Sequence, residues 1–135
     1  MIELVDYSDD YYAVHLKGAV PEVRQGKFVQ MRNEKSGQEF LLLSPKEFSP
    51  YHSDIVERFC RSKGIKGSRN QTLQIFVIDD ESWDVLGGGL WGINSRDKIL
   101  MLAGSSQAYG RFVSGGLDAK IAALKQFAGY TINIE

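Results

Sequence analysis

The feature that most constrains the fold is an apolar run that leads into a loop of small residues. Ile99 to Ala103 is continuously apolar, with Arg96-Asp97 before it and Gly104 after it. Such a run predicts a strand covered on both faces of a sheet. The loop from Gly104 to Gly110 then carries two glycines, two serines and an alanine.

Helical spacing follows this loop from Arg111 onward. The residues that fall near one face are Phe112, Gly116, Leu117, Ile121, Leu124 and Phe127. Small loop residues let backbone N–H groups approach a ligand, and the N-terminus of a following helix adds positive charge. The combination predicts an anion site, although many turns of this kind bind nothing.

Composition narrows the classes of protein that fit. The chain has 135 residues, 43% of them hydrophobic, so we expect a single domain over 1–135. Sixteen basic against 17 acidic residues give neither a nucleic-acid footprint nor a polybasic membrane patch. The lone Cys60 rules out an intramolecular disulfide, and the two histidines, His15 and His52, rule out a His-rich metal cluster. Without a signal peptide or spanning segment, a cytoplasmic protein is expected.

The order of predicted elements favours an α/β (α+β) domain: a mixed sheet of about six to seven strands flanked by two helices. Strands are predicted at 11–16, 27–32, 38–43, 72–78, 83–89, 99–103 and 130–134. Gly37 should adopt positive φ in a hairpin turn, and the 40–43 run indicates a central strand. Three successive glycines, Gly87 to Gly89, indicate a bulge or a close approach of another group.

The clearest predicted helix spans 49–64, with Ser49 as N-cap, Pro50 in the first turn and Gly64 at the end. His52 then lies in the first turn, where unsatisfied N–H groups and the macrodipole disfavour imidazolium. A neutral imidazole there can accept a proton, although His52 is equally a candidate surface or capping residue. Cys60, well past the first turn, is predicted to pack rather than react.

Several segments resemble the phosphohistidine phosphatases of the Janus/Ocnus family. Pro50-Tyr-His-Ser-Asp-Ile55 is similar to their Tyr-His-Ala-Asp-Ile segment, and Leu86-Gly-Gly-Gly89 to their Leu-Gly-Gly-Gly. Asp97-Lys98 resembles the Asp-Lys pair at the start of one of their strands, and Ser106-Gln-Ala-Tyr-Gly110 resembles their Ser-Met-Ala-Tyr-Gly loop. Lys27-Phe-Val-Gln-Met-Arg32 is similar to one of their early strands. The resemblance covers about residues 26 to 132, in the same order.

The resemblance implies a metal-independent phosphatase without cofactors, acting on a phosphorylated protein or a small phosphoramidate. His52 would be the general base for water, and Lys27 a substrate-side cation. The amides of Ser106, Gln107 and Ala108 would hold the phosphate. The whole expected binding set is Lys27, Ser105, Ser106, Gln107, Ala108, Tyr109 and Gly110.

Three positions depart from the family pattern. Leu90 and Ser44 stand where the family has arginines, and Ser105 where it has tyrosine. Unless Arg24, Arg32 or Arg111 compensates, the loss of two cations weakens phosphate binding. The segment around 65–82 is also longer than in the family.

Three interpretations of function therefore remain. The first is a phosphatase for phosphohistidine or another phosphoramidate. The second is an inactive module that binds phosphate, a phosphopeptide or a protein partner on the same fold. The third places the function elsewhere on the surface, in the added segment 65–82. A nucleotide-binding loop at 86–92 is disfavoured, because the lysine of a P-loop is missing.

Overall fold

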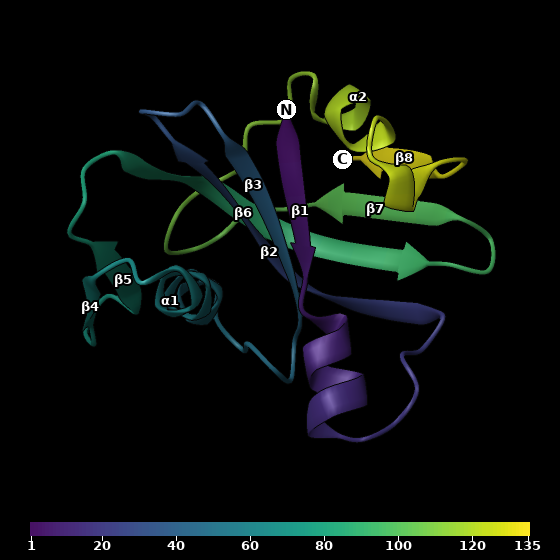
Figure 1. Cartoon of the computed structure of the whole chain (residues 1–135), viewed down its shortest axis with the longest axis horizontal. Coiled ribbons are helices and arrows are strands. Elements are labelled where there is room, and N and C mark those ends of the chain that lie inside the picture. Colours follow the sequence, from purple (N-terminus) through teal and green to yellow (C-terminus); the bar gives the residue numbers. More distant parts are fainter.

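The computed structural model describes all 135 residues and is built on a six-stranded mixed sheet (Figure 1). In spatial order its strands are β1 (Ile2–Asp6), β3 (Glu39–Pro45), β2 (Val23–Asn33), β6 (Trp83–Asn94), β7 (Ile99–Ala103) and β8 (Thr131–Ile134). The β1–β3 and β7–β8 pairs are parallel and the others are antiparallel. A separate two-stranded sheet joins β4 (Gly67–Asn70) to β5 (Ile75–Ile78). The predicted α+β class is confirmed.

Two cores lie on opposite faces of the large sheet. Helix α1 (His52–Lys63) packs Ile55, Val56 and Phe59 against one face, and α2 (Leu117–Ala122) covers the other. Strand β3 sends alternate side chains to the two cores, so its continuous apolar run is buried on both sides, as predicted for a central strand. Figure 1 shows α1 beside the β4–β5 hairpin and α2 near β7 and β8.

The glycine predictions are confirmed. Gly37 has a φ of 73° in the turn between β2 and β3. The register of β2 against β6 shifts between Gln30 and Met31, opposite the start of the glycine run, which marks a bulge. The predicted close approach of another group is also confirmed, because a Cβ built on Gly88 would lie 2.5 Å from the Phe28 carbonyl oxygen. Only glycine fits there without displacing the neighbouring strand.

Two predictions of secondary structure in the N-terminal half of the chain are wrong. The segment predicted as a strand at 11–16 falls mostly in a π-helix, η1 (Asp9–His15), in which Tyr11 packs against Phe48. Helix α1 begins at His52 with Tyr51 as N-cap, so Pro50 lies outside it. Ser49 is fully buried and receives a hydrogen bond from the Ser44 hydroxyl (2.7 Å), which removes it from the cap. The strand β1 at the N-terminus was not predicted.

Later segments also differ from the predictions. The expected helix from Arg111 is reduced to α2, because Gly116 adopts φ 74° and 111–116 stays non-helical. Strand β7 is fully buried on one face only, since Ile99 is 37% exposed while Leu100 is completely buried. Strand β4 lies where no strand is predicted, and the predicted strand at 72–78 shortens to β5. Gly64 does end α1, with φ 70°.

Candidate functional site

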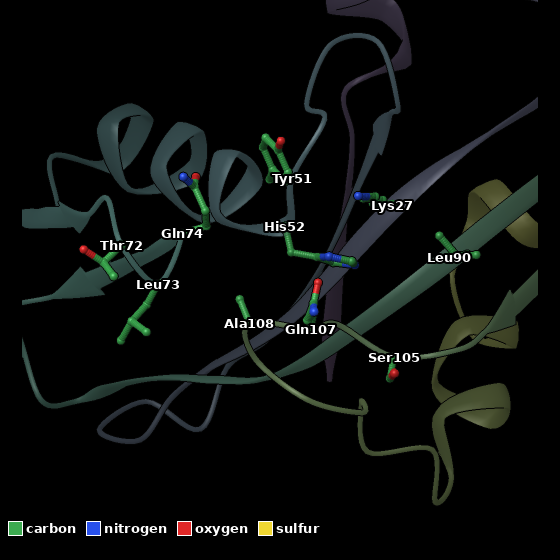
Figure 2. A pocket seen from close by; sticks show the side chains of 10 residues that line it. All are labelled: Lys27, Tyr51, His52, Thr72, Leu73, Gln74, Leu90, Ser105, Gln107 and Ala108. Carbon is green, nitrogen blue, oxygen red and sulfur yellow. The ribbon is translucent and has the colours of Figure 1, made fainter.

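A cavity of about 580 Å³ lies at the N-terminal end of α1 (Figure 2). Four parts of the chain border it: the β2–β6 surface, the start of α1, the loop after β7 and the tip of the β4–β5 hairpin. Its lining residues are Lys27, Tyr51, His52, Thr72, Leu73, Gln74, Leu90, Ser105, Gln107 and Ala108. Five of the eight predicted site residues therefore meet at one cavity: His52, Lys27, Ser105, Gln107 and Ala108.

His52 is the first residue of α1 and lines the cavity, and only 8% of the residue is exposed. Its Nε2 lies 2.9 Å from the carbonyl oxygen of Gly89. Because a carbonyl only accepts, Nε2 carries the hydrogen, and the neutral ring keeps its lone pair on Nδ1. Nδ1 makes no hydrogen bond within the protein, so this nitrogen is the one available to accept a proton.

Burial lowers the pKa of His52 below its ordinary value, because the interior disfavours the charged imidazolium. The hydrogen bond to Gly89 opposes this shift, and the positive charge of Lys27 adds to it. His52 is therefore neutral at pH 7, which is the protonation state that a general base requires.

Gly88 brings the imidazole and the loop together. A Cβ at this position would lie 2.8 Å from His52 Cδ2 and 3.3 Å from the Ser106 Cβ. The ring and the base of the loop therefore flank the same backbone segment of β6. The absence of a side chain at Gly88 is what allows the two halves of the site to approach so closely.

The backbone N–H groups of the loop from Gly104 to Gly110 differ in whether they have a hydrogen-bond acceptor within the protein. The N–H groups of Ser106, Tyr109 and Gly110 are engaged, with Gly110 O, Ser106 Oγ and Ser106 O respectively. Those of Gln107 and Ala108, and that of Ser105, have no acceptor within the protein. The predicted amide set of Ser106, Gln107 and Ala108 is thus wrong for Ser106, whose N–H is already used.

Ser106, Tyr109 and Gly110 do not line the cavity, and they shape the loop instead. Ser106 is 3% exposed and forms a closed pair of backbone hydrogen bonds with Gly110. Gly110 has a φ of 83°, which favours glycine at this turn. The Tyr109 hydroxyl makes its hydrogen bonds outside the loop, with the backbone of Phe76 in β5.

The helix terminus at the cavity belongs to α1, because Tyr51 and His52 line the cavity and no residue of α2 does. The prediction that the helix after the loop supplies positive charge is wrong, since α2 begins only at Leu117. The positive end of a helix is nevertheless present, from a different element.

Lys27 is the only charged side chain that lines the cavity. Its Nζ donates to the carbonyl oxygen of Pro50 (2.6 Å) and lies 5.6 Å from the centre of the Tyr51 ring. An ammonium has three N–H groups, so two remain for a ligand. The side chain is held at the cavity while most of its donor capacity stays free.

None of the three arginines proposed to compensate for Leu90 and Ser44 reaches the cavity. Arg24 pairs with Asp6 (3.2 Å) and Arg32 with Glu34 (2.9 Å). Arg111 donates to the carbonyl oxygens of Gly104 and Glu135. Leu90 itself is 49% exposed and borders the cavity, whereas Ser44 is fully buried.

The remaining reactive groups do not offer an alternative centre. Burial raises the pKa of Cys60 to about 11, which agrees with its predicted packing role. Nowhere do three or more His, Cys, Asp or Glu side chains gather in a way that would hold a metal ion. No helix is both long and apolar enough to cross a membrane.

Sequence reasoning missed the contribution of Tyr51, Thr72, Leu73 and Gln74 to the cavity. Tyr51 precedes His52 directly, so the position of the histidine was a signal for it. The three hairpin residues carried no such signal, because their place depends on how β4 and β5 fold back on α1.

Comparison with known proteins gives no family assignment: no protein-family model matches the chain, and no curated protein matches it either.

Proposed function

We propose that the cavity hydrolyses phosphohistidine or a related phosphoramidate, with His52 as the general base. The observation that carries the proposal is the meeting of a neutral imidazole and unengaged loop amides at one cavity. The resemblance of five segments to the phosphohistidine phosphatases supports the same chemistry. A cytoplasmic location belongs to the proposal, because an unpaired thiol such as Cys60 suits a reducing compartment.

The phosphoryl group would be held by hydrogen bonds rather than by a dense cluster of charges. Its oxygens accept the free N–H groups of Gln107 and Ala108, with Ser105 at the edge of the same loop. Lys27 adds a point charge with two available donors. Phosphoryl transfer depends mainly on positioning and on stabilising charge spread over the equatorial oxygens, which these groups supply.

The reaction consumes one water molecule. His52 Nδ1 takes a proton from the water, whose oxygen bonds to phosphorus as the P–N bond breaks. The proton on the imidazolium then passes to the departing nitrogen, so the products are phosphate and the free amine or imidazole. The Gly89 carbonyl accepts from Nε2–H throughout, which fixes the ring and favours the transient imidazolium.

The test compares the wild-type chain with His52→Ala and with His15→Ala, using phosphoramidate and a phosphohistidine peptide. Removal of a general base typically costs about 10²- to 10⁴-fold, so His52→Ala should lose at least about a hundredfold in kcat. His15 is an exposed residue of η1 away from the cavity, and its variant should match wild type. Equal turnover by His52→Ala and wild type, or no turnover by wild type, contradicts the proposal.

A second candidate is an inactive module that binds a phosphate group or a phosphopeptide at the same place. The observation that favours it is the single cation at the cavity, with Leu90 exposed where the resembled family carries an arginine. This candidate predicts phosphate binding without release of phosphate from any phosphoramidate. Calorimetric titration with inorganic phosphate, alongside the turnover assay, separates the two functions.

A further inference from the structure

The tip of the β4–β5 hairpin forms one wall of the cavity. Thr72, Leu73 and Gln74 line it from the side opposite Lys27 and Leu90 (Figure 2). These residues belong to the segment 65–82, which the sequence sets apart as an addition to the resembled family. The segment is therefore placed at the candidate site and not at a separate surface.

Two specific contacts hold the hairpin in this position. The Tyr109 hydroxyl accepts from the Phe76 N–H (2.9 Å) and donates to the Phe76 carbonyl oxygen (3.0 Å). On the other side, Arg69 donates to Ser53 Oγ (2.9 Å) and forms ion pairs with Asp54 (2.9 Å) and Glu57 (2.7 Å). Tyr109 follows the free amide of Ala108 and Ser53 follows His52, so the hairpin is fastened to both halves of the site.

The rim of the cavity is apolar on three sides. Tyr51, Leu73 and Leu90 are 55%, 61% and 49% exposed, and they come from the start of α1, the hairpin tip and β6. Large apolar side chains exposed around one concave site indicate a ligand that covers them. No carboxylate lines the cavity, and Lys27 is its only charge.

We propose that the substrate carries its phosphoryl group on an uncharged apolar or aromatic body, which lies between Leu73 and Leu90. This inference rests on the proposed function and assigns its substrate class. A phosphoryl group at the loop amides fills only part of the cavity, and the space beyond it is bounded by the hairpin tip and Leu90. One lysine matches one phosphoryl group, and it leaves no partner for a second charge on the body.

Leu73 is the specificity-determining residue in this account, and Tyr109 and Arg69 are positioning residues. The Leu73 side chain belongs to neither core of the fold, and 61% of the residue is exposed at the hairpin tip. Covering it with an apolar group removes both surfaces from water, which favours such a substrate over one with a polar or anionic body.

The test measures binding by calorimetry with three non-hydrolysable probes: inorganic phosphate, benzylphosphonate and carboxymethylphosphonate. Wild type should bind benzylphosphonate more tightly than the other two. In Leu73→Ala the ratio of benzylphosphonate affinity to phosphate affinity should fall about threefold to tenfold. Val77→Ala is the matched control, since Val77 is a 51% exposed apolar residue of the same hairpin that does not line the cavity.

The outcomes separate this inference from the proposed function. An unchanged affinity ratio in Leu73→Ala, an equal fall in Val77→Ala, or tighter binding of carboxymethylphosphonate than of benzylphosphonate overturns the inference, even if the enzyme turns over phosphoramidates. The expected affinity ratios together with no turnover by wild type support the binding preference and overturn the hydrolase. Failure of all three probes to bind overturns both.

Discussion

The two sides of the cavity are built by different means. On the side of His52, the ring, Gly88 and Ser106 are packed against the sheet, and a Cβ added at Gly88 would collide with backbone and with the imidazole. On the side of the hairpin, β4 and β5 pair only with each other, and they are held by the Tyr109 hydroxyl, Arg69 and the buried ring of Phe76, while the tip at Leu73 stays exposed. We therefore assign the proposed hydrolysis to the rigid side, which holds His52, and the proposed substrate selectivity to the hairpin side, which a substitution changes most easily.

The largest effect is expected from Gly88→Ala on the packed side. The new Cβ would lie 2.5 Å from the Phe28 carbonyl oxygen and 2.8 Å from His52 Cδ2, so the strand and the ring must both shift. Overpacking of this kind costs about 1–3 kcal/mol in the free energy of unfolding, measured by urea denaturation.

Gly92→Ala in the same strand is the matched control for that prediction. Its Cβ would meet only the end of the Met101 side chain, at 3.6 Å, which is an ordinary contact. The control should lie within about 0.5 kcal/mol of wild type. Equal losses in the two variants would show that Gly88 is not specially constrained, and the description of a rigid side would fail.

The second prediction concerns the pH dependence that His52 gives to the free energy of unfolding. Its pKa is lowered in the folded chain, so the unfolded chain binds the proton more tightly. The free energy of unfolding should therefore fall as the pH drops through the ordinary histidine value of about 6.5. Turnover should remain full at neutral pH and decline by about tenfold per pH unit only below the lowered pKa.

His52→Gln provides the comparison for the pH series, because it cannot take up a proton at this position. Its unfolding free energy should lack the part of the pH dependence that wild type shows between the lowered pKa and about 6.5. The same slope in both proteins would mean that another group is responsible, and would remove the argument for a neutral imidazole.

A smaller effect is expected from Leu90→Arg, which adds a cation between the two sides. Leu90 is 49% exposed at the cavity, so an arginine fits without burying charge. A charge-assisted hydrogen bond at such an exposed position should raise the affinity for inorganic phosphate by about threefold to tenfold. The same charge placed by Leu16→Arg, at an exposed residue outside the cavity, should have no such effect in calorimetry.

The smallest effect is expected from Tyr109→Phe, which removes the hydroxyl that holds the hairpin. Loss of these hydrogen bonds should raise KM for an aromatic phosphoramidate by about twofold to fivefold, because the hairpin tip is less well placed. The kcat should change little. Tyr130→Phe, which removes a hydroxyl without a hydrogen-bond partner, is the control, and a fall in kcat without a change in KM would contradict the positioning role.

The sequence predicted the parts of this molecule that depend on local pattern. The existence of strands at 40–43 and 99–103, the turn at Gly37 and the end of α1 at Gly64 all follow from apolar runs and glycine chemistry, although β7 is buried on one face only. His52 could be placed in a first helical turn, and the glycine run could be recognised as a close approach, because both signals lie within a few residues.

The sequence could not predict features set by distant contacts. Tyr11 has strand propensity, but its packing on Phe48 accompanies a π-helix. The Ser106 N–H was predicted to bind phosphate, but in the structure it donates to the carbonyl oxygen of Gly110. The place of the hairpin at the cavity depends on the contacts of Tyr109 and Arg69, and on the packing of Phe76 in the same core as α1.

The most direct test of the account is nuclear magnetic resonance of the chain during titration with inorganic phosphate. We predict that the amide signals of Ser105, Gln107 and Ala108 shift most, and that the pKa of His52, low in the free protein, rises when the anion binds beside it. Shifts confined to other surfaces, or a His52 pKa that does not respond to phosphate, would contradict the claim that the imidazole and the loop amides act on one phosphoryl group.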